Sequence, residues 1–101
     1  MKSIMQDTKE CFITHDTNNL HLHHIFPGGN RKNSEKYGLT IWLRADWHNL
    51  APYGVHQNGA LDRDIKKLAQ EKWEQTYGSR EDFRRIFGKS WLDMGEKNGN
   101  N

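Results

Sequence analysis

The sequence predicts a single α+β domain in which a β-hairpin comes first and helices follow. Residues 20–25 largely alternate between apolar and histidine side chains, and residues 39–43 are rich in β-branched and aromatic side chains, as strands are. From residue 59 onward the apolar residues recur every three or four positions, which is the spacing of amphipathic helices. A chain of 101 residues, of which 34% are hydrophobic, supports one domain with a small core.

Three regions are predicted along the chain. Residues 1–10 are polar and are expected to be a flexible arm, residues 11–92 to form the folded domain, and residues 93–101 to be a disordered tail rich in Gly and Asn. Four Trp, three Tyr and four Phe supply much of the core volume. A core this small often needs an additional stabilising element, and in domains of this size a bound metal ion is a common one.

The first strand has two distinct faces, because successive side chains of a strand point to opposite sides. One face carries Leu20, Leu22 and His24, and the other carries His21, His23 and Ile25. The strand is expected to end at Pro27-Gly28-Gly29, and a basic loop to continue from there to Gly38. The second strand then follows at residues 39–43, so that the two strands form a hairpin with a long loop.

Two helices are expected in the second half of the domain. The first spans residues 59–77 and ends at Gly78. Its apolar face carries Leu61, Ile65, Leu68, Ala69 and Trp73. The second spans residues 79–88, and Ser79 followed by Asp82 is typical of a capping box at its start. The side chains expected in the core from this region are Phe83, Ile86, Phe87, Trp91 and Leu92.

The formal net charge of +2 is weak evidence for nucleic-acid binding, because phosphate binding depends on local positive charge rather than on the total. Basic residues gather after the Gly-Gly turn and again near the C-terminal helix. The candidate nucleic-acid contacts are Arg31, Lys32, Lys36, Arg84 and Arg85. For each cluster taken alone, a solvated charged face is the alternative.

Cysteine content and hydropathy indicate the expected cellular compartment. Cys11 is the single cysteine, so no disulfide can form within the chain, which fits a reducing cytosol. No apolar run approaches the roughly 20 residues of a spanning helix, and the N-terminus lacks the apolar region of a signal peptide. We therefore expect a cytoplasmic protein without membrane association.

The histidines are the most informative residues. The chain has six of them, and the adjacent pair His23-His24 is followed by a Pro-Gly-Gly turn and later by His48-Asn49. Imidazole is the commonest metal ligand and also the side chain whose ordinary pKa lies nearest neutrality. Two adjacent histidines can therefore divide the work of a metal-dependent phosphodiesterase, since one can hold the ion while the other takes a proton from water. Satisfied core or surface histidines are the alternative interpretation.

The order of these motifs resembles the HNH nucleases of the ββα-metal superfamily. The resemblance covers roughly residues 11–92 and is carried by the His-His pair, the Pro-Gly turn, a strand and then Leu-Arg-Ala-Asp-Trp-His-Asn at residues 43–49. With Gly54-Val55-His56 it is similar to small phage and prophage proteins, some of whose relatives are recombination-associated nucleases. The resemblance implies a ββα-metal hairpin-plus-helix core with additional C-terminal helices, acting on DNA in a bacterial host. Recombination or phage proteins are candidate partners, and the oligomeric state is left open.

The resemblance also assigns roles to the histidines. It implies that His23 and His48 bind one divalent ion and that His24 is the general base. The family often places its last ligand four residues after His48, where Pro52 stands and cannot ligate. His56 is the remaining candidate, with Asp46 or Asn49 as alternatives. Zn, Mn, Ni or Co suit imidazole ligands. The resemblance to the family implies that Mg is a further candidate for the bound ion.

The chain departs from the family pattern in two places. Many HNH domains hold a structural zinc with four cysteines, and the matching positions here are Cys11, Thr14, Arg44 and Trp47. One thiol cannot hold a structural zinc, so no zinc knuckle is expected and Trp47 is expected to pack in its place. The family's middle Asn, which fixes the loop of the general base, is replaced by Leu39 or Thr40. Asn49, Asn58 or a backbone carbonyl is expected to orient His24 instead.

These assignments predict an endonuclease of low sequence specificity. His24 would take a proton from the attacking water, and the products would carry 5′-phosphate and 3′-hydroxyl ends, as the family implies. Two other functions stay open. The first is a non-catalytic, metal-stapled module that binds nucleic acid or protein, and the second is a small interaction protein without metal.

Overall fold

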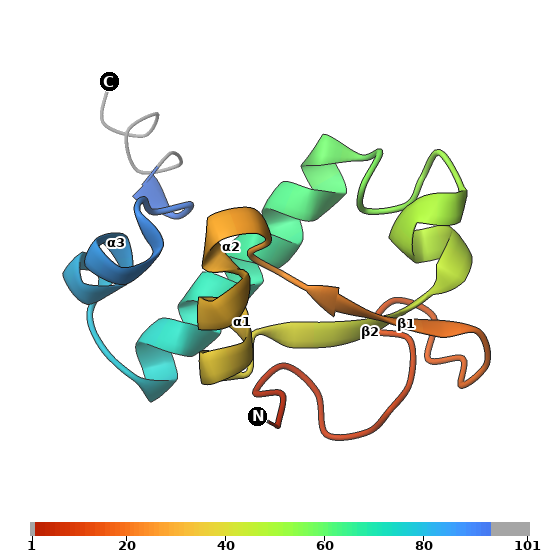
Figure 1. Ribbon diagram of the computed structural model, residues 1–101, viewed down its shortest axis with the longest axis horizontal. Helices are drawn as coiled ribbons and strands as arrows, with labels where there is room; N and C mark the ends of the chain where they lie inside the picture. The colour runs from red at the N-terminus through yellow and green to blue at the C-terminus, as the bar shows by residue number, and fades with distance from the viewer. Residues whose placement is uncertain (1, 94–101) are drawn as a thin grey trace.

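The computed structural model describes residues 2–93 and shows an α+β fold (Figure 1). The elements in chain order are β1 (Leu20–His24), the 3₁₀ turn η1 (Gly28–Asn30), α1 (Arg31–Tyr37), β2 (Thr40–Arg44), the π-helical turn η2 (Asp46–Leu50), α2 (Gly59–Thr76) and α3 (Arg80–Phe87). The predicted class is thus confirmed at the level of a hairpin followed by helices.

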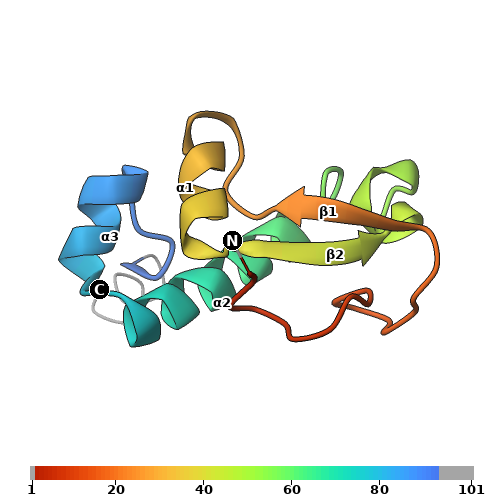
Figure 2. The same ribbon diagram turned by 60° about the horizontal axis from the view of Figure 1, so that its bottom comes forward.

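The strands β1 and β2 pair antiparallel in a two-stranded sheet. Leu20 lies opposite Arg44, and His23 lies opposite Ile41. His23 is buried at 4% exposure whereas Leu22 is 44% exposed, so the predicted division of β1 into two faces is confirmed. Helix α2 runs beneath α1 and the adjoining end of the hairpin (Figure 2). A continuous core joins Ile25 and Ile41 of the hairpin region to residues of α2 and α3.

The two C-terminal helices agree closely with the predicted ranges. Asn58 caps α2 by accepting a hydrogen bond from the Leu61 backbone N–H, and the capping box of Ser79 and Asp82 is present at the start of α3. Trp91 folds back as expected, with its ring centroid 4.8 Å from that of Phe26. The prediction was wrong for Leu68, which is 49% exposed because α2 turns this residue away from the core.

The segment between the strands was predicted to be a loop, but it contains the seven-residue helix α1. Its sequence has no apolar periodicity, so its stability comes from tertiary contacts rather than from an amphipathic face. The buried Ser34 hydroxyl donates to the Phe26 carbonyl (2.9 Å) and accepts from the Phe26 N–H (3.0 Å). Gly38 ends the helix in the left-handed conformation (φ 72°), and a Cβ there would lie 2.4 Å from the Lys2 carbonyl oxygen.

The N-terminal segment expected to be a flexible arm lies along the free edge of β2 (Figure 2). The Ser3 hydroxyl donates to the Thr40 carbonyl (2.6 Å), and the Gln6 side-chain oxygen accepts from the Trp42 N–H (2.6 Å). These side chains satisfy backbone groups that would otherwise be left open at an edge strand. The predicted disordered tail lies outside the described residues except for Asp93. Within residues 2–93, no helix combines the length and hydropathy needed to cross a bilayer.

Candidate metal centre

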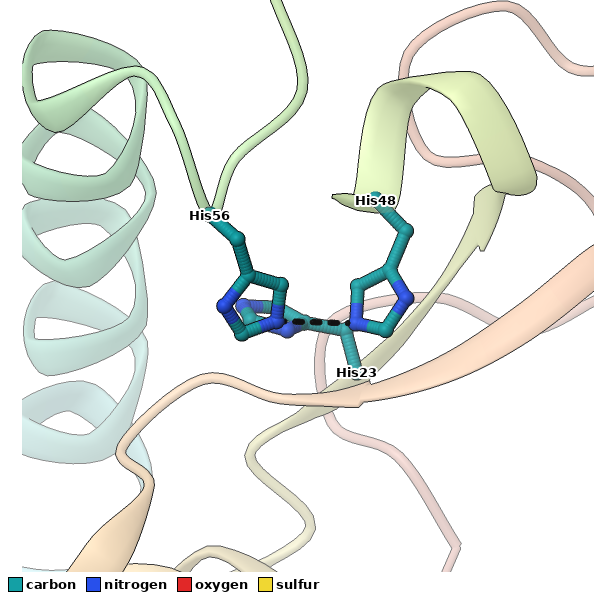
Figure 3. Close-up of side chains that lie close together, drawn as sticks. All are labelled: His23, His48 and His56. Carbon is teal, nitrogen blue, oxygen red and sulfur yellow. Dashed lines mark hydrogen bonds between the residues drawn. The ribbon is translucent and has the colours of Figure 1, made fainter. Parts of the chain in front are cut away.

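His23, His48 and His56 meet at one point of the structure (Figure 3). One ring nitrogen from each of the three histidines lies within 4.8 Å of the others, which is close enough for all three to bind one metal ion. His23 comes from β1, His48 from η2 and His56 from the loop that leads into α2 (Figure 3). These are the three residues predicted from the sequence as metal ligands.

The loop that delivers His56 is held by backbone pairing with η2. The Val55 N–H donates to the Trp47 carbonyl (2.8 Å), and the His56 N–H donates to the His48 carbonyl (3.1 Å). Gly54 makes this approach feasible, because a Cβ at that position would lie 2.7 Å from the Asp46 carbonyl oxygen and 3.0 Å from that of His48. The segment thus loops out as the sequence analysis required for His56 to reach the site.

The surroundings of the cluster favour the neutral forms of His23 and His48. Burial, reinforced by the proximity of His48 and His56, lowers the pKa of His23 to about 3. Burial and the proximity of His56 and His21 lower the pKa of His48 to about 4. Both rings are therefore unprotonated near neutral pH, and a neutral imidazole has the free lone pair that a metal ion needs.

We expect the metal-free protein to lose stability as the pH falls below about 6.5. In the unfolded chain the histidines bind protons near their ordinary pKa, whereas folded His23 and His48 stay neutral down to about 3 and 4. The unfolded state therefore binds more protons in this window, and acid favours unfolding. Urea titrations in chelator between pH 7.5 and 5 measure this effect, which should be smaller in a His23→Gln variant. A free energy of unfolding that does not change over this range would contradict the assignment.

His21 supports the cluster from its outer side. Its Nδ1 lies 3.0 Å from Nδ1 of His48, while Nε2 of His48 lies 3.1 Å from Nε2 of His56 (the dashed line in Figure 3). If Nε2 of His48 binds the ion, its Nδ1–H donates to His21 and fixes the orientation of the ring. His21 was not predicted as a site residue, although the strand alternation had already placed it on the same face as His23.

We expect His21→Phe to weaken metal binding by about 10–100-fold, because it removes the acceptor that orients His48. His21→Asn keeps an acceptor near that position and is expected to bind more tightly than His21→Phe. Titration calorimetry with Zn and Mn measures both affinities. Equal affinities for the two variants and the wild type would show that the contact with His48 does not contribute to ion binding.

His24 lies next to this cluster but outside it. It lines a pocket of about 350 Å³ together with the three clustered histidines, Gly28 and Arg31. Its side chain is 12% exposed, and its Nε2 lies 3.1 Å from a carboxylate oxygen of Glu35 in α1. The predicted general base thus faces the same pocket as the candidate metal ligands.

The two asparagines expected to orient His24 take part in other hydrogen bonds. Asn58 uses its side-chain oxygen to cap α2, and Asn49 is exposed in η2, where its carbonyl accepts from the Gln57 side chain (3.2 Å). The structure instead brings Glu35 to His24. Glu35 was not predicted as a site residue, because its contact with His24 depends on α1, which was predicted to be a loop.

Positions matching the family's structural zinc site form a network of hydrogen bonds and ion pairs. The Thr14 N–H lies 3.4 Å from the Cys11 sulfur, and Arg44 binds both Asp16 and Asp46. Burial alone would raise the pKa of Cys11, but hydrogen bonds from Thr14 and from backbone N–H groups outweigh it and lower the pKa. Trp47 packs against Tyr53, with ring centroids 4.6 Å apart.

Asp46, the alternative third ligand, belongs to this network. It accepts hydrogen bonds from the Arg44 guanidinium (2.7 Å), the Trp47 N–H (3.0 Å) and the Tyr53 hydroxyl (2.6 Å). The hydrogen bond from Arg44 is the main reason that the pKa of Asp46 lies well below its usual range. Its oxygens are therefore occupied by protein donors, whereas the His56 nitrogen faces His48.

The candidate nucleic-acid contacts fall into two groups. Arg31 lines the pocket, and Lys32 and Lys36 lie with it on α1. Arg84 and Arg85 lie on α3, at the opposite end of the molecule from η2 (Figures 1 and 2). Arg84 donates to Asp93 (2.6 Å) and Arg85 donates to Asp82 (2.8 Å), so the positive charges of both arginines are already partly compensated. Contact of either group with DNA stays a prediction, and the α1 group is the one beside the site.

No protein-family model, curated protein or solved structure matches the chain. The resemblance to HNH nucleases therefore rests on the order of motifs in the sequence. The function has to be argued from the chemistry of the site.

Proposed function

We propose that this protein is a metal-dependent endonuclease of the HNH type, which hydrolyses DNA phosphodiester bonds. The observation that carries the proposal is the placement of four histidines around one pocket. Three of them converge closely enough to hold an ion, while His24 lies outside that set and still lines the same pocket. An ion site with an additional proton acceptor beside it is what phosphodiester hydrolysis requires.

The donor set fits a divalent transition metal. His23, His48 and His56 offer three imidazole nitrogens, which suit Zn, Mn or Ni more than Mg. Three protein ligands match the pattern of catalytic zinc sites, whereas structural sites are closed by four. When bound, the ion would act as a Lewis acid that stabilises negative charge on the phosphate and on the leaving oxygen.

The other pocket residues supply proton transfer and charge. Imidazole is well matched to proton transfer near neutral pH, so His24 takes the proton of the attacking water. Arg31 lines the same pocket, and its guanidinium group can bind a phosphate oxygen. Arg31 and Lys32 bind phosphates without reading bases, which supports the expectation of low sequence specificity.

The proposal includes a ββα-metal arrangement of the site. The hairpin of β1 and β2 supplies His23 and His24, while η2 and the loop before α2 supply His48 and His56. The long helix α2 starts three residues after His56. The order of hairpin, ligand-bearing turn and helix supports the HNH assignment.

The proposal is tested by incubating the protein with supercoiled plasmid and with single-stranded DNA, in Mn, Mg, Ni or Zn and in excess chelator. We expect nicking that requires an added ion, falls with salt and shows little preference for base sequence. Cleavage that persists in chelator would contradict a metal-dependent reaction. A folded, metal-loaded protein that cuts neither substrate would contradict the enzyme assignment and favour the second candidate.

The second candidate is a metal-stapled binding module without turnover. One observation favours it, namely the position of His21 at 3.0 Å from His48, at the edge of the cluster. A fourth histidine that joined the ion would close the site, as in structural zinc sites. The number of protein ligands on the ion therefore separates the two functions.

A further inference from the structure

We infer that Glu35 is the positioning residue for the general base, forming a His–Glu pair with His24. This inference rests on the proposed function and gives the base a partner other than Asn49, Asn58 or the backbone carbonyl expected from the sequence. Glu35 is not one of the residues that converge on the candidate ion site, and its contact with His24 defines which ring nitrogen is free to accept a proton.

The contact selects one tautomer of His24. The Glu35 Oε2 lies 3.1 Å from Nε2 of His24. An ionised carboxylate can only accept hydrogen bonds, so Nε2 of His24 must carry the hydrogen. A neutral imidazole has one N–H, and Nδ1 is then the nitrogen with a free lone pair. A carboxylate that holds a catalytic histidine in one tautomer, and stabilises the ring once it is protonated, is a recurring arrangement in hydrolases.

The backbone that carries Glu35 is fixed relative to β1. Its neighbour Ser34 is fully buried and makes reciprocal hydrogen bonds with the backbone of Phe26, two residues after His24. The Leu39 N–H donates to the Ser34 carbonyl (2.8 Å), which ties the end of α1 to the start of the second strand. Side chains at the start of α1 also bind α3, as Asn30 donates to the Phe87 carbonyl (2.9 Å). These hydrogen bonds fix the backbone that places the Glu35 side chain within reach of His24.

Exposure shows that the pair contributes little to folding. The Glu35 side chain is 57% exposed, and ion pairs in such positions are worth little to stability. Variants of Glu35 are therefore expected to stay folded. Replacement of Glu35 should therefore remove the partner of His24 without unfolding the protein. A change in activity can then be attributed to His24 rather than to loss of the fold.

The test compares Glu35→Ala and Glu35→Gln with the wild type and with Glu81→Gln, an exposed glutamate of α3, the helix at the opposite end of the molecule from η2. We expect Glu35→Ala to lower kcat by about 10–100-fold with little change in KM. Glu35→Gln keeps an oxygen acceptor and is expected to recover part of this loss. Glu81→Gln should behave as the wild type. The affinity for Zn, measured by calorimetry, should stay within twofold in all of them.

Nitrogen NMR of the zinc-loaded protein at neutral pH reads the tautomer directly. In the wild type and in Glu35→Gln we expect the His24 signals of a ring protonated on Nε2, and in Glu35→Ala a shift toward the Nδ1–H form or a mixture. An unchanged tautomer in Glu35→Ala, whether kcat falls or not, overturns the inference. If the wild type cuts no DNA, the proposed function is wrong. The nitrogen signals of His24 still test the pairing of His24 with Glu35 in that case.

Discussion

Replacement of His24 by alanine is expected to reduce DNA cleavage by roughly 10²–10⁴-fold, which is the usual loss when a general base is removed. Metal affinity should stay within a fewfold of the wild type, because His24 lies outside the set of nitrogens that converge on the candidate ion site. Plasmid nicking under single-turnover conditions measures the first effect, and titration calorimetry with Mn or Zn measures the second.

A matched histidine control is available in the same chain. His15 is 73% exposed and is paired with Glu10, away from the pocket. It has a positive φ of 69°, so asparagine is the suitable replacement. His15→Asn should cut DNA at the wild-type rate. Near-normal cleavage by His24→Ala would remove His24 from the mechanism.

Loss of any one of the three clustered histidines is expected to have the largest effect on metal binding and on metal-dependent stability. An ion that binds only the folded state stabilises it by about 2.7 kcal/mol when its concentration is 100 times Kd. This gain should disappear in His56→Ala, whose exposed side chain can be removed without creating a core cavity. His23→Ala should lose it as well, but this change also empties a buried position.

The measurement is thermal unfolding with and without Zn. The wild type should melt at a higher temperature with the ion, whereas His56→Ala should melt at the same temperature in both conditions and close to the metal-free wild type. Should His56→Ala bind metal and cut DNA normally, the third ligand would have to be sought again at Asp46 or Asn49. The hydrogen bonds that engage Asp46 make this outcome unexpected.

Features encoded in local patterns could be predicted from the sequence. Alternation along β1 placed His23 on the face of Ile25 and opposite Leu22, and the structure shows that the His23 face is the buried one. The Ser79–Asp82 spacing located the start of α3. His56 could be predicted as a ligand although it is far from His23 in sequence, because Pro52 and Gly54 allow the chain between His48 and His56 to loop out. The absence of a Cβ at Gly54 proved essential for that loop.

Features that depend on tertiary contacts could not be predicted in this way. Helix α1 is stabilised by the hydrogen bonds between Ser34 and Phe26, and no apolar periodicity in the sequence predicts them. Glu35 was missed with it, since its contact with His24 exists only when residues 31–37 are helical. The N-terminal segment is polar, yet Ser3 and Gln6 bind the edge of β2 through specific side-chain hydrogen bonds. Composition alone suggested a flexible arm there.

The most direct test of the account is a crystal structure of the wild-type protein loaded with zinc, with the ion located by its anomalous signal. We predict one ion held by nitrogens of His23, His48 and His56 at about 2.0–2.1 Å, with the remaining coordination held by solvent and with His21 and His24 outside the shell. A shell closed by a fourth protein ligand, or an ion bound elsewhere in the chain, would contradict the account of this pocket as an open catalytic site.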